Sequence, residues 1–481
     1  MSFSRGLIGI ASTPDPAHAE IQKQLADLID IRSSIVVFEL ELSLSTFAHR
    51  LNQQMSIHMQ VSPSSCLVDE CPRICVTSAE PDSLYTIKGS VRHRDKTLVS
   101  YGHFKSSATG EIDLNRHSSL GGTYTGLDNA GLFWSLQCMK HVKATILTVR
   151  DVQKPLKMVF SVHQGALTKQ EIDKSDAMTS CQLDRRFLSD HVKTYDVSDG
   201  KLRGTVFIPT GKGPFPGIID MYGLNGSLKP SRAALLSSYG FVTYALPYFA
   251  YKDLVKDVAD VDLRYFEEAL NWFSSQEYVD SSRIALVGTS LGAMLSIVMA
   301  TYWPDMIRAV VSYNATHHRT ITPRTYYGKT LPYINSNGNP VVNIDGALNY
   351  LKSFSCKLLN KSESTAIQIE KAKADFLFIA GEDDQIIPSV YCASRMTERL
   401  NQNGHHNHRT LVYPGTGHLI DPGLLPVTNI TRNPFDVDTT ITYGGGLPEH
   451  AKAQEHSWKI VKEFLRKTLA IQLNKNNNNN K

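Results

Sequence analysis

The sequence predicts an all-β domain followed by a domain in which helices cover both faces of a mostly parallel sheet. Apolar residues alternate with a period of two from about Ser56 to Val152, which is typical of antiparallel strands with one buried face. From about His191 onward, strand patterns alternate with helix patterns, as a parallel sheet requires. The length of 481 residues also favours two domains, because it exceeds what one hydrophobic core usually supports.

Two terminal segments flank these domains. Residues 1–55 form an extension of unassigned role, since Ile21, Leu25 and Leu28 have helical spacing but the segment resembles neither a mitochondrial transit peptide nor a secretory signal. Residues 471–481 form a tail rich in Asn and Lys that we predict to be disordered. The all-β domain with its linker is therefore expected at 56–190, and the α/β domain at 191–470.

Within 56–190, the alternating runs predict an antiparallel β-sandwich. The clearest runs are 56–61, 83–89 and 98–103, and helical patterns are nearly absent. The stretch 121–136 contains several glycines and then becomes strongly apolar, which predicts turns followed by a buried aromatic strand. A phosphate-binding loop fits this stretch less well, because no Lys-Ser or Lys-Thr follows it and no strand-then-helix unit frames it.

The α/β region reads as a regular alternation of elements. We predict strands at 202–209, 215–222, 241–248, 284–287, 306–314, 374–380 and 408–413, and helices at 231–239, 261–276, 291–300, 391–403 and 449–469. The connection 315–373 is too long for a plain loop. We therefore expect it to fold as an insertion near the functional site.

The whole α/β region is organised around Ser290, which stands in a Gly-Thr-Ser-Leu-Gly sequence at 288–292. A buried strand pattern precedes this motif and an apolar helix follows it, so that the serine is expected on a sharp strand-to-helix turn. Gly288 and Gly292 are expected to leave room where the strand and the helix approach each other. This context predicts that Ser290 is a nucleophile.

A serine nucleophile needs a base, and the base needs an acid that fixes its tautomer. In a strand-turn-helix context of this type, the acid and then the histidine follow the serine in the chain, each after a later strand. Asp384 and His418 stand directly after predicted strands and satisfy this order. The sequence therefore predicts the triad Ser290, Asp384 and His418.

Other acidic residues and histidines compete for these roles. Asp383 and Glu382 share the turn with Asp384, and either could be the orienting acid or a solvated loop carboxylate. The competing histidines are either clustered before the last strand or too early in the chain order: His405, His406, His408, His317 and His318. We interpret His405, His406 and His408 as residues of a polar surface turn, and we set His317 and His318 aside because of their place in the chain order.

Acyl transfer also requires donors for the developing oxyanion. The backbone N–H of Leu291, at the start of the nucleophile helix, is one candidate. The backbone N–H of Leu224, in the turn after the strand 215–222, is the other. We predict no metal ion and no bound cofactor, because Cys66, Cys71 and Cys75 lack the spacing and the histidine partners of a zinc site.

Composition narrows the classes of function. The net charge of +4 comes without a dense basic block, which argues against nucleic-acid binding. No stretch reaches the roughly 18 apolar residues of a membrane span, so stable membrane insertion is not expected. The odd number of cysteines, seven, favours a reducing compartment over a disulfide framework. The sequence makes no prediction of the oligomeric state.

Several stretches together resemble one enzyme family, that of the acyl-CoA thioesterases and bile acid-CoA:amino acid N-acyltransferases, over about residues 57–470. The stretches that carry the resemblance are 121–136, 215–223, 265–269, 288–292, 327–332, 381–384 and 417–418. The resemblance implies an immunoglobulin-like N-terminal domain before an α/β-hydrolase domain. It also implies the triad Ser290, Asp384 and His418, and acyl-CoA as the substrate.

The resemblance also bears on the reaction and the location. Members that transfer the acyl group to glycine or taurine carry Cys at the elbow, whereas this chain has Ser290, so hydrolysis to free fatty acid and CoA is expected. An amino-acid N-acyltransferase, a carboxylesterase not specific for CoA and an inactive acyl-CoA binder remain alternatives. We expect the cytoplasm as the location, because the N-terminus is acidic and the C-terminus is not Ser-Lys-Leu-like.

Overall fold

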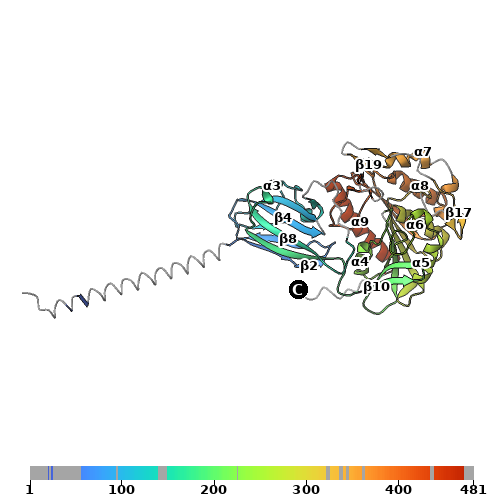
Figure 1. Cartoon of the computed structure of the whole chain (residues 1–481), viewed down its shortest axis with the longest axis horizontal. Helices are drawn as coiled ribbons and strands as arrows, with labels where there is room; N and C mark the ends of the chain where they lie inside the picture. The colour runs from blue at the N-terminus through green and yellow to red at the C-terminus, as the bar shows by residue number, and fades with distance from the viewer. Residues whose placement is uncertain are drawn as a thin grey trace, which may run out of the picture.

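The computed structural model describes two packed regions, one dominated by strands and one in which helices flank a large sheet (Figure 1). It describes residues 56–470, apart from 94–95, 139–148, 225, 321–324, 335–339, 343–345, 360–362 and 434–437, and it also describes residues 20, 23 and 24. Apart from these three residues, the predicted extension 1–55 lies outside the described residues. The predicted tail 471–481 does so entirely.

The N-terminal region contains two sheets around one core. The smaller sheet has the order β1 (His58–Ser62), β3 (Arg73–Thr77), β6 (Ile112–Asp113), and the larger has the order β2 (Ser65–Leu67), β9 (Thr179–Arg186), β8 (Leu156–Gln164), β4 (Leu84–His93), β5 (Lys96–Lys105), β7 (Gln137–Cys138). All strand pairs are antiparallel except β2 with β9. Ile74 of the smaller sheet and Ile87 and Phe160 of the larger belong to the same buried cluster. The antiparallel arrangement expected for this region is confirmed.

One prediction for this region was wrong. The aromatic segment expected as a strand within 121–136 forms the short helix α2 (Gly131–Trp134). The carboxylate of Asp128 accepts hydrogen bonds from the backbone N–H of Ala130, at 2.8 Å, and from the indole N–H of Trp134, at 2.9 Å. These bonds stabilise a helical turn, and a short apolar run does not by itself distinguish a buried strand from a buried helix. A second short helix, α3 (Lys169–Ile172), begins with a capping box formed by Thr168 and Glu171.

The C-terminal region is built on an eight-stranded mixed sheet. Its order is β10 (Val192–Asp199), β11 (Leu202–Pro209), β13 (Val242–Ala245), β12 (Phe215–Met221), β14 (Val279–Thr289), β15 (Ala309–Tyr313), β20 (Asp375–Gly381), β21 (His408–Tyr413). The pairs β10–β11 and β11–β13 are antiparallel, and the remaining pairs are parallel. The mostly parallel sheet is therefore as predicted, although β10 was not predicted as a strand.

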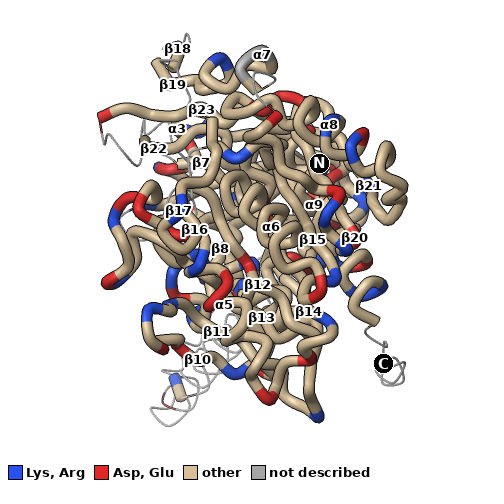
Figure 2. The backbone as a smooth tube through the Cα atoms, turned by 90° about the vertical axis from the view of Figure 1, so that its right-hand side faces the viewer, with Lys and Arg blue, Asp and Glu red and all other residues tan. Residues whose placement is uncertain are grey.

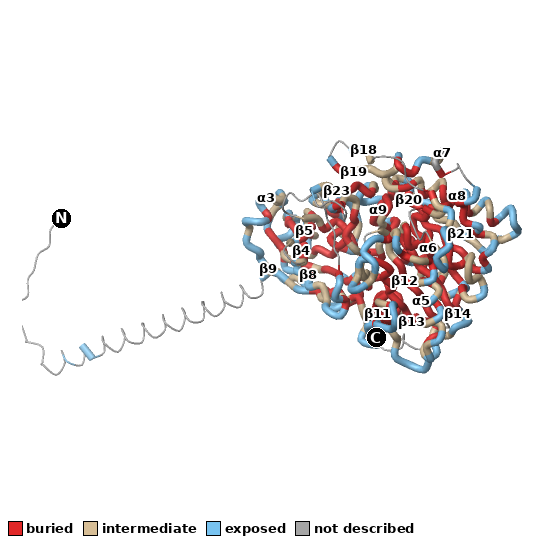
Figure 3. Tube along the Cα trace, turned by 45° about the vertical axis from the view of Figure 1, so that its right-hand side comes forward, coloured by how far each residue is buried: buried red, intermediate tan, exposed pale blue. Residues whose placement is uncertain are grey.

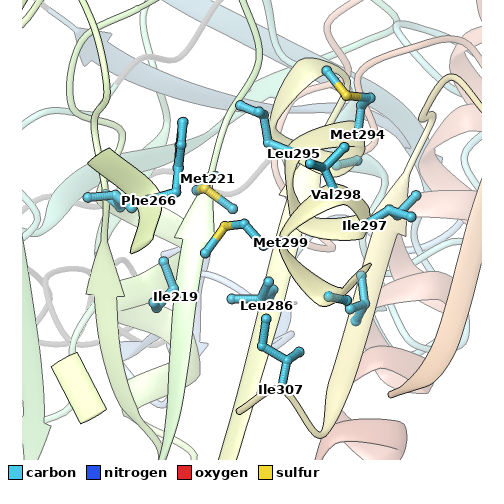
Figure 4. Close-up of a cluster of buried hydrophobic side chains, with 14 of the residues drawn as sticks. Ile219, Met221, Phe266, Leu286, Met294, Leu295, Ile297, Val298, Met299 and Ile307 are labelled. Atoms are coloured by element: carbon cyan, nitrogen blue, oxygen red, sulfur yellow. The ribbon is translucent and has the colours of Figure 1, made fainter. Parts of the chain in front are cut away.

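Helices cover both faces of this sheet, as its apolar strands require. They are α4 (Ser231–Ser237), α5 (Arg264–Ser274), α6 (Leu291–Tyr302), α8 (Ser389–Gln402) and α9 (Leu447–Thr468). Along β14, Ile284 and Leu286 belong to the cluster with α5, α6 and α8, whereas Ala285 and Val287 belong to the cluster with α4 and α9. Figure 4 shows side chains of α6, such as Met299, beside Leu286. Figure 3 shows that the buried residues are concentrated in the centre of this region, along the sheet and the helices beside it.

The insertion 315–373 and the segment after β21 form small elements of their own. The strands are β16 (Thr325–Tyr326), β17 (Lys329–Thr330), β18 (Val341–Val342), β19 (Ala347–Asn349), β22 (Ile430–Arg432) and β23 (Thr440–Thr442). The helices are α7 (Cys356–Leu359) and the 3₁₀ turns η2 (Leu351–Phe354), η3 (Glu363–Thr365) and η4 (Ile369–Lys371). A further 3₁₀ turn, η1 (Val258–Asp260), precedes α5. A four-stranded sheet, β18-β19-β23-β22, joins the insertion to the later segment. The insertion was predicted, but this pairing was not.

A buried carboxylate connects the two regions. Asp69, in the N-terminal region, accepts hydrogen bonds from the hydroxyl of Tyr239 and the indole N–H of Trp458, both at 2.6 Å, and from Lys462 Nζ at 2.8 Å. The side chain of Asp69 is completely buried. Because a buried charge is costly without partners, this contact favours a close arrangement of the two regions.

Candidate active site

Ser290 lies at the junction of β14 and α6, as its motif predicted. Its backbone has φ 58° and ψ −122°, a conformation that costs a non-glycine residue on the order of 1 to 3 kcal/mol. The backbone N–H of Ser290 donates to the carbonyl of Tyr313 at 2.8 Å. The neighbouring strand therefore helps to hold the serine in a strained turn, as in a nucleophile elbow.

Glycines surround this turn because the backbones approach closely. A Cβ on Gly288 would lie 2.3 Å from the carbonyl oxygen of Gly292, and one on Gly292 would lie 2.4 Å from that of Met221. A Cβ on Gly223 would lie 2.9 Å from the Cβ of Ser290. Gly223 ends the stretch 215–223 that carries the family resemblance, and in the structure it lies against the serine.

His418 and Asp384 form a buried pair. His418 Nδ1 lies 2.7 Å from Asp384 Oδ2, and both side chains are almost fully buried. The carboxylate also accepts hydrogen bonds from the backbone N–H of Ile386, at 2.8 Å, from that of Ile387, at 3.1 Å, and from the hydroxyl of Ser389. Because this carboxylate accepts from three other donors, it also accepts from His418, so the proton of His418 is on Nδ1 and Nε2 is left to act as a base.

The sheet order brings the serine and this pair to the same edge. Strands β14, β15, β20 and β21 are adjacent and parallel, and Ser290, Asn314, Asp384 and His418 follow their carboxyl ends. Asn314 Nδ2 donates to the backbone carbonyl of His418 at 2.7 Å. Among the described residues, no hydrogen bond joins Ser290 Oγ to His418. Catalytic hydrogen bonds are often long without substrate and shorten in the complex.

The competing residues have other partners. Asp383 accepts from the backbone N–H of Gly445, at 2.8 Å, and from Gln385 Nε2, at 2.6 Å, so it braces a neighbouring loop. Glu382 is exposed. His408 Nε2 lies 2.9 Å from Asn401 Oδ1, on the surface. Of the three acids in this turn, Asp384 is the one bonded to His418.

The predicted oxyanion donors lie in two different elements. The N–H of Leu291 is at the first residue of α6, next to Ser290. Leu224 follows Gly223 in the turn after β12 and is partly buried against the core. Tyr248, which the sequence did not indicate, donates its hydroxyl to the carbonyl of Tyr222 at 2.5 Å and so restrains the start of this turn.

A buried ion pair lies beneath the turn that carries Ser290. Arg232 of α4 donates through Nε to Asp220 at 2.8 Å and through Nη1 to the hydroxyl of Thr289 at 2.7 Å. Its guanidinium also lies over the ring of Tyr313, 5.3 Å from the centroid. Burial raises the pKa of Asp220, although Arg232 opposes this. Arg232 therefore links the ends of β12, β14 and β15, a role that no local sequence signal indicated.

His317 and His318 line a cavity of about 670 Å³ between the insertion and α8. Burial lowers the pKa of His317 to about 3 and that of His318 to about 4. His318 Nδ1 lies 2.8 Å from the hydroxyl of Thr365. The lowered pKa of both histidines favours the neutral ring at pH 7, and both belong to the wall of the cavity.

One group of potential metal ligands occurs among the described residues, in the N-terminal region. Cys75, Glu111 and Asp113 place ligand atoms within 4.8 Å of one another. Arg73 Nη2 donates to Asp113 at 2.8 Å and lies 3.8 Å from Glu111, so a guanidinium already pairs with both carboxylates. Cys66 and Cys71, the other cysteines considered from sequence, are free thiols.

The sequence analysis also considered the distribution of charge and the length of apolar stretches. Figure 2 shows Lys and Arg interspersed with Asp and Glu around the face that it presents. In the part of the chain that the structure describes, the helices lack the combination of length and apolar character that a membrane span needs.

Comparison with known proteins identifies related chains along most of the sequence. Residues 69–199 match the family described as acyl-CoA thioester hydrolase/BAAT N-terminal region, and residues 261–471 match BAAT/acyl-CoA thioester hydrolase C terminal. Among the solved structures, a hyperthermophilic esterase from Pyrobaculum calidifontis has 15% identity and a TM-score of 0.36, covering 59% of this chain and 85% of its own. The fold assigned above therefore rests on the sheet order of the chain itself.

The curated relatives carry names of two kinds. Mouse acyl-coenzyme A amino acid N-acyltransferase 1 is 36% identical over 417 residues, 86% of this chain and 98% of the relative. Human bile acid-CoA:amino acid N-acyltransferase is 35% identical over 416 residues, 86% and 98%. Human acyl-coenzyme A thioesterase 1 is 34% identical over 406 residues, 84% and 94%. On this identity and coverage, the chain belongs to the family of acyl-CoA thioesterases and bile acid-CoA:amino acid N-acyltransferases.

Proposed function

We propose that this protein is a serine hydrolase that cleaves acyl-CoA thioesters to free fatty acid and CoA through an acyl-Ser290 intermediate. The observation that carries the proposal is the buried His418–Asp384 hydrogen bond of 2.7 Å at the sheet edge that also bears the strained Ser290 turn. A base that is oriented by an acid and lies beside a serine hydroxyl is the arrangement that activates serine. The thioesterase relatives support acyl-CoA as the substrate class.

The proposed mechanism has two half-reactions, acylation of Ser290 and hydrolysis of the acyl-serine, and His418 transfers the proton in both. His418 Nε2 removes the proton of Ser290 Oγ as the oxygen attacks the thioester carbonyl, and the backbone N–H groups of Leu291 and Leu224 stabilise the oxyanion. CoA leaves as the thiol, with the proton returned by His418. His418 then deprotonates a water molecule, which attacks the acyl-serine ester; the ester bond breaks, the fatty acid is released and His418 returns the proton to Ser290 Oγ.

The remaining features of the proposal concern the whole chain. An immunoglobulin-like domain at 56–190 is supported by the antiparallel sheets around one core, and a catalytic domain at 191–470 is supported by the mixed sheet. We propose the cytoplasm as the location, without a stable membrane insertion or a nucleic-acid partner. No metal ion or cofactor is needed for the proposed reaction.

Amino-acid N-acylation is the second candidate, because the relatives at 36% and 35% identity are named N-acyltransferases. The acyl-serine intermediate is an oxygen ester, which is less open to attack by an amine than a thioester, so water is the expected acceptor. Incubation with acyl-CoA and glycine or taurine, followed by mass spectrometry, separates the two reactions. A dominant conjugate would establish the transferase instead.

The decisive variant is Ser290→Ala. We expect at least about a 10³-fold loss of CoA release from acyl-CoA, with an unchanged thermal unfolding temperature, because the hydroxyl contributes only to chemistry. Ser394→Ala, on the exposed side of α8, is the matched control and should retain activity. Full activity in Ser290→Ala would refute the mechanism. Faster turnover of a p-nitrophenyl ester than of the matching acyl-CoA would favour a carboxylesterase.

A further inference from the structure

A second histidine, His450 of α9, lies buried against the segment that carries His418. The backbone N–H of Gly417 donates to His450 Nδ1 at 3.3 Å, and His450 Nε2 lies 2.8 Å from the carbonyl of Leu419. A backbone N–H can only donate and a carbonyl can only accept, so the ring must be neutral with its proton on Nε2. His450 thus contacts the backbone on both sides of His418.

Asn314, at the end of β15, holds the same segment from another direction. Its Nδ2 donates to the carbonyl of His418 at 2.7 Å and to that of Gly417 at 3.4 Å. Its Oδ1 accepts from the backbone N–H of Gly381 at 2.9 Å, on the strand that leads to Asp384. One amide side chain therefore joins the backbone of the histidine to the strand of its acid.

The segment 417–419 has little freedom left between these groups. The N–H of His418 donates to the carbonyl of Tyr443 at 2.8 Å, and the two rings stack with centroids 6.0 Å apart. A Cβ on Gly417 would lie 2.2 Å from the carbonyl oxygen of Gly444. The backbone around His418 is thus restrained by β15, by the segment after β23 and by α9.

His450 places a polar ring in a fully buried position. The side chain is completely buried, and burial lowers its pKa to about 4, so the protonated form is excluded at neutral pH. Burying a polar ring is unfavourable unless its hydrogen bonds are made. The two hydrogen bonds that His450 makes through its ring are those that flank His418.

We propose that His450 and Asn314 are positioning residues that fix the backbone of 417–419, so that the His418 ring stays aligned with Asp384 and Ser290. The proposal rests on the serine mechanism above. It acts through His418 alone, because neither side chain needs to contact substrate. A shift of about 1 Å in a reacting group can cost roughly 100-fold in rate.

The test measures the activation of Ser290 without acyl-CoA. A fluorophosphonate probe reacts when Ser290 Oγ attacks phosphorus and fluoride leaves, and this requires His418 to accept the serine proton. The variants are His450→Leu, which removes both hydrogen bonds, and His450→Gln, which can retain the donor to Leu419. Gln454→Leu is the matched control, since Gln454 is buried one turn later on α9 and donates to the carbonyl of Leu425 at 3.0 Å, away from His418.

We expect His450→Leu to slow labelling and to lower kcat for acyl-CoA by about 10- to 100-fold with KM unchanged. His450→Gln should recover part of the rate, and Asn314→Asp should be slow, because its carboxylate faces carbonyl oxygens. Gln454→Leu should label at the wild-type rate, even if its unfolding temperature falls as far as that of His450→Leu.

Equal slowing in His450→Leu and Gln454→Leu would overturn the proposal and leave His450 a purely structural residue. If His450→Leu does not fold, wild-type labelling rates in both His450→Gln and Asn314→Asp would overturn it as well. Normal labelling of the wild-type protein without CoA release would instead refute the proposed substrate, and the comparison of variants would still stand. Absence of labelling in the wild-type protein would refute the serine mechanism itself.

Discussion

The two regions bury their charged side chains in different places. In the N-terminal region, Asp113 pairs with Arg73 at a sheet edge, and Asp69 faces the other region. In the C-terminal region, the pairs Asp220–Arg232 and Asp384–His418 lie near the carboxyl ends of parallel strands. Both regions have apolar cores, and among the described residues these two buried pairs of the C-terminal region lie at the sheet edge that carries the strained Ser290 turn.

This difference shows that the location of buried polar groups distinguishes groups that stabilise the fold from groups that lie at the candidate active site. A buried charge is unfavourable wherever it lies, so each instance needs partners. In the N-terminal region these partners join strands or join the two regions. In the C-terminal region they converge on one sheet edge from β12, β14, β15 and β20, which is where an enzyme with parallel strands places its site.

The largest expected effect is on catalysis, and it tests whether the buried acid of the C-terminal region acts through His418. In Asp384→Asn, the amide no longer holds the Nδ1–H tautomer, and kcat for acyl-CoA should fall by about 10³- to 10⁴-fold. Asp383→Asn is the matched control, because Asp383 bonds to Gly445 and Gln385 instead. A greater loss in Asp383→Asn than in Asp384→Asn, measured as CoA thiol release, would reverse the assignment.

The next largest effect is on the free energy of unfolding, and it comes from the buried ion pair beneath the Ser290 turn. Arg232→Met leaves Asp220 buried without a charged partner, and the free energy of unfolding should fall by about 3 to 5 kcal/mol in urea titrations. Adding Asp220→Asn should restore part of the loss. Arg264→Met removes an exposed pair with Glu268 and should cost less than about 1 kcal/mol. Similar losses in Arg232→Met and Arg264→Met would remove the contrast between buried and exposed pairs.

Acid should destabilise the C-terminal region through its buried histidines. The pKa of His450 is lowered from 6.5 to about 4 by burial, so below pH 6.5 the unfolded chain binds a proton that the folded protein excludes. Stability is therefore complete above pH 6.5 and falls as the pH decreases, by on the order of 2 kcal/mol from this residue at pH 5. His317 and His318 act in the same direction.

Urea titrations at pH 5 and pH 7.5 measure this effect. His450→Gln should lose less stability between the two values than the wild-type protein does, because Gln does not titrate. His406→Gln, at an exposed position, should keep the wild-type dependence. An unchanged dependence in His450→Gln would mean that the ring is already protonated or solvated in the folded protein.

The smallest effect tests the contact between the regions. Asp69→Asn weakens the bonds to Lys462, Trp458 and Tyr239, and should lower the free energy of unfolding by about 1 to 2 kcal/mol without changing kcat. Lys105→Met removes an exposed pair with Asp82 and serves as the control in the same region. A large loss of kcat in Asp69→Asn would show that the N-terminal region contributes to the site directly.

Local patterns in the sequence were sufficient for the elements that carry the predicted triad. The strand β21 was predicted with the observed bounds, and Ser290, Asp384 and His418 were selected because each follows a strand pattern in a loop with small residues. Strand and helix periodicity is a property of consecutive residues, so it can be read without knowing what the chain packs against. The same was true of the glycines beside Ser290, whose spacing reports a close approach of backbones.

Contacts between residues far apart in the chain were decided only by the tertiary structure. The pairing of β19 with β23, the ion pair of Asp220 with Arg232 and the contact of His450 with Gly417 and Leu419 leave no periodic trace, because neither partner determines where the other lies. The helix α2 was missed for a related reason, since its short apolar run fits a buried strand equally well and its side-chain bonds to Asp128 decide the outcome. The sequence by itself determined which residues could do chemistry, whereas long-range packing determined which buried groups hold them in place.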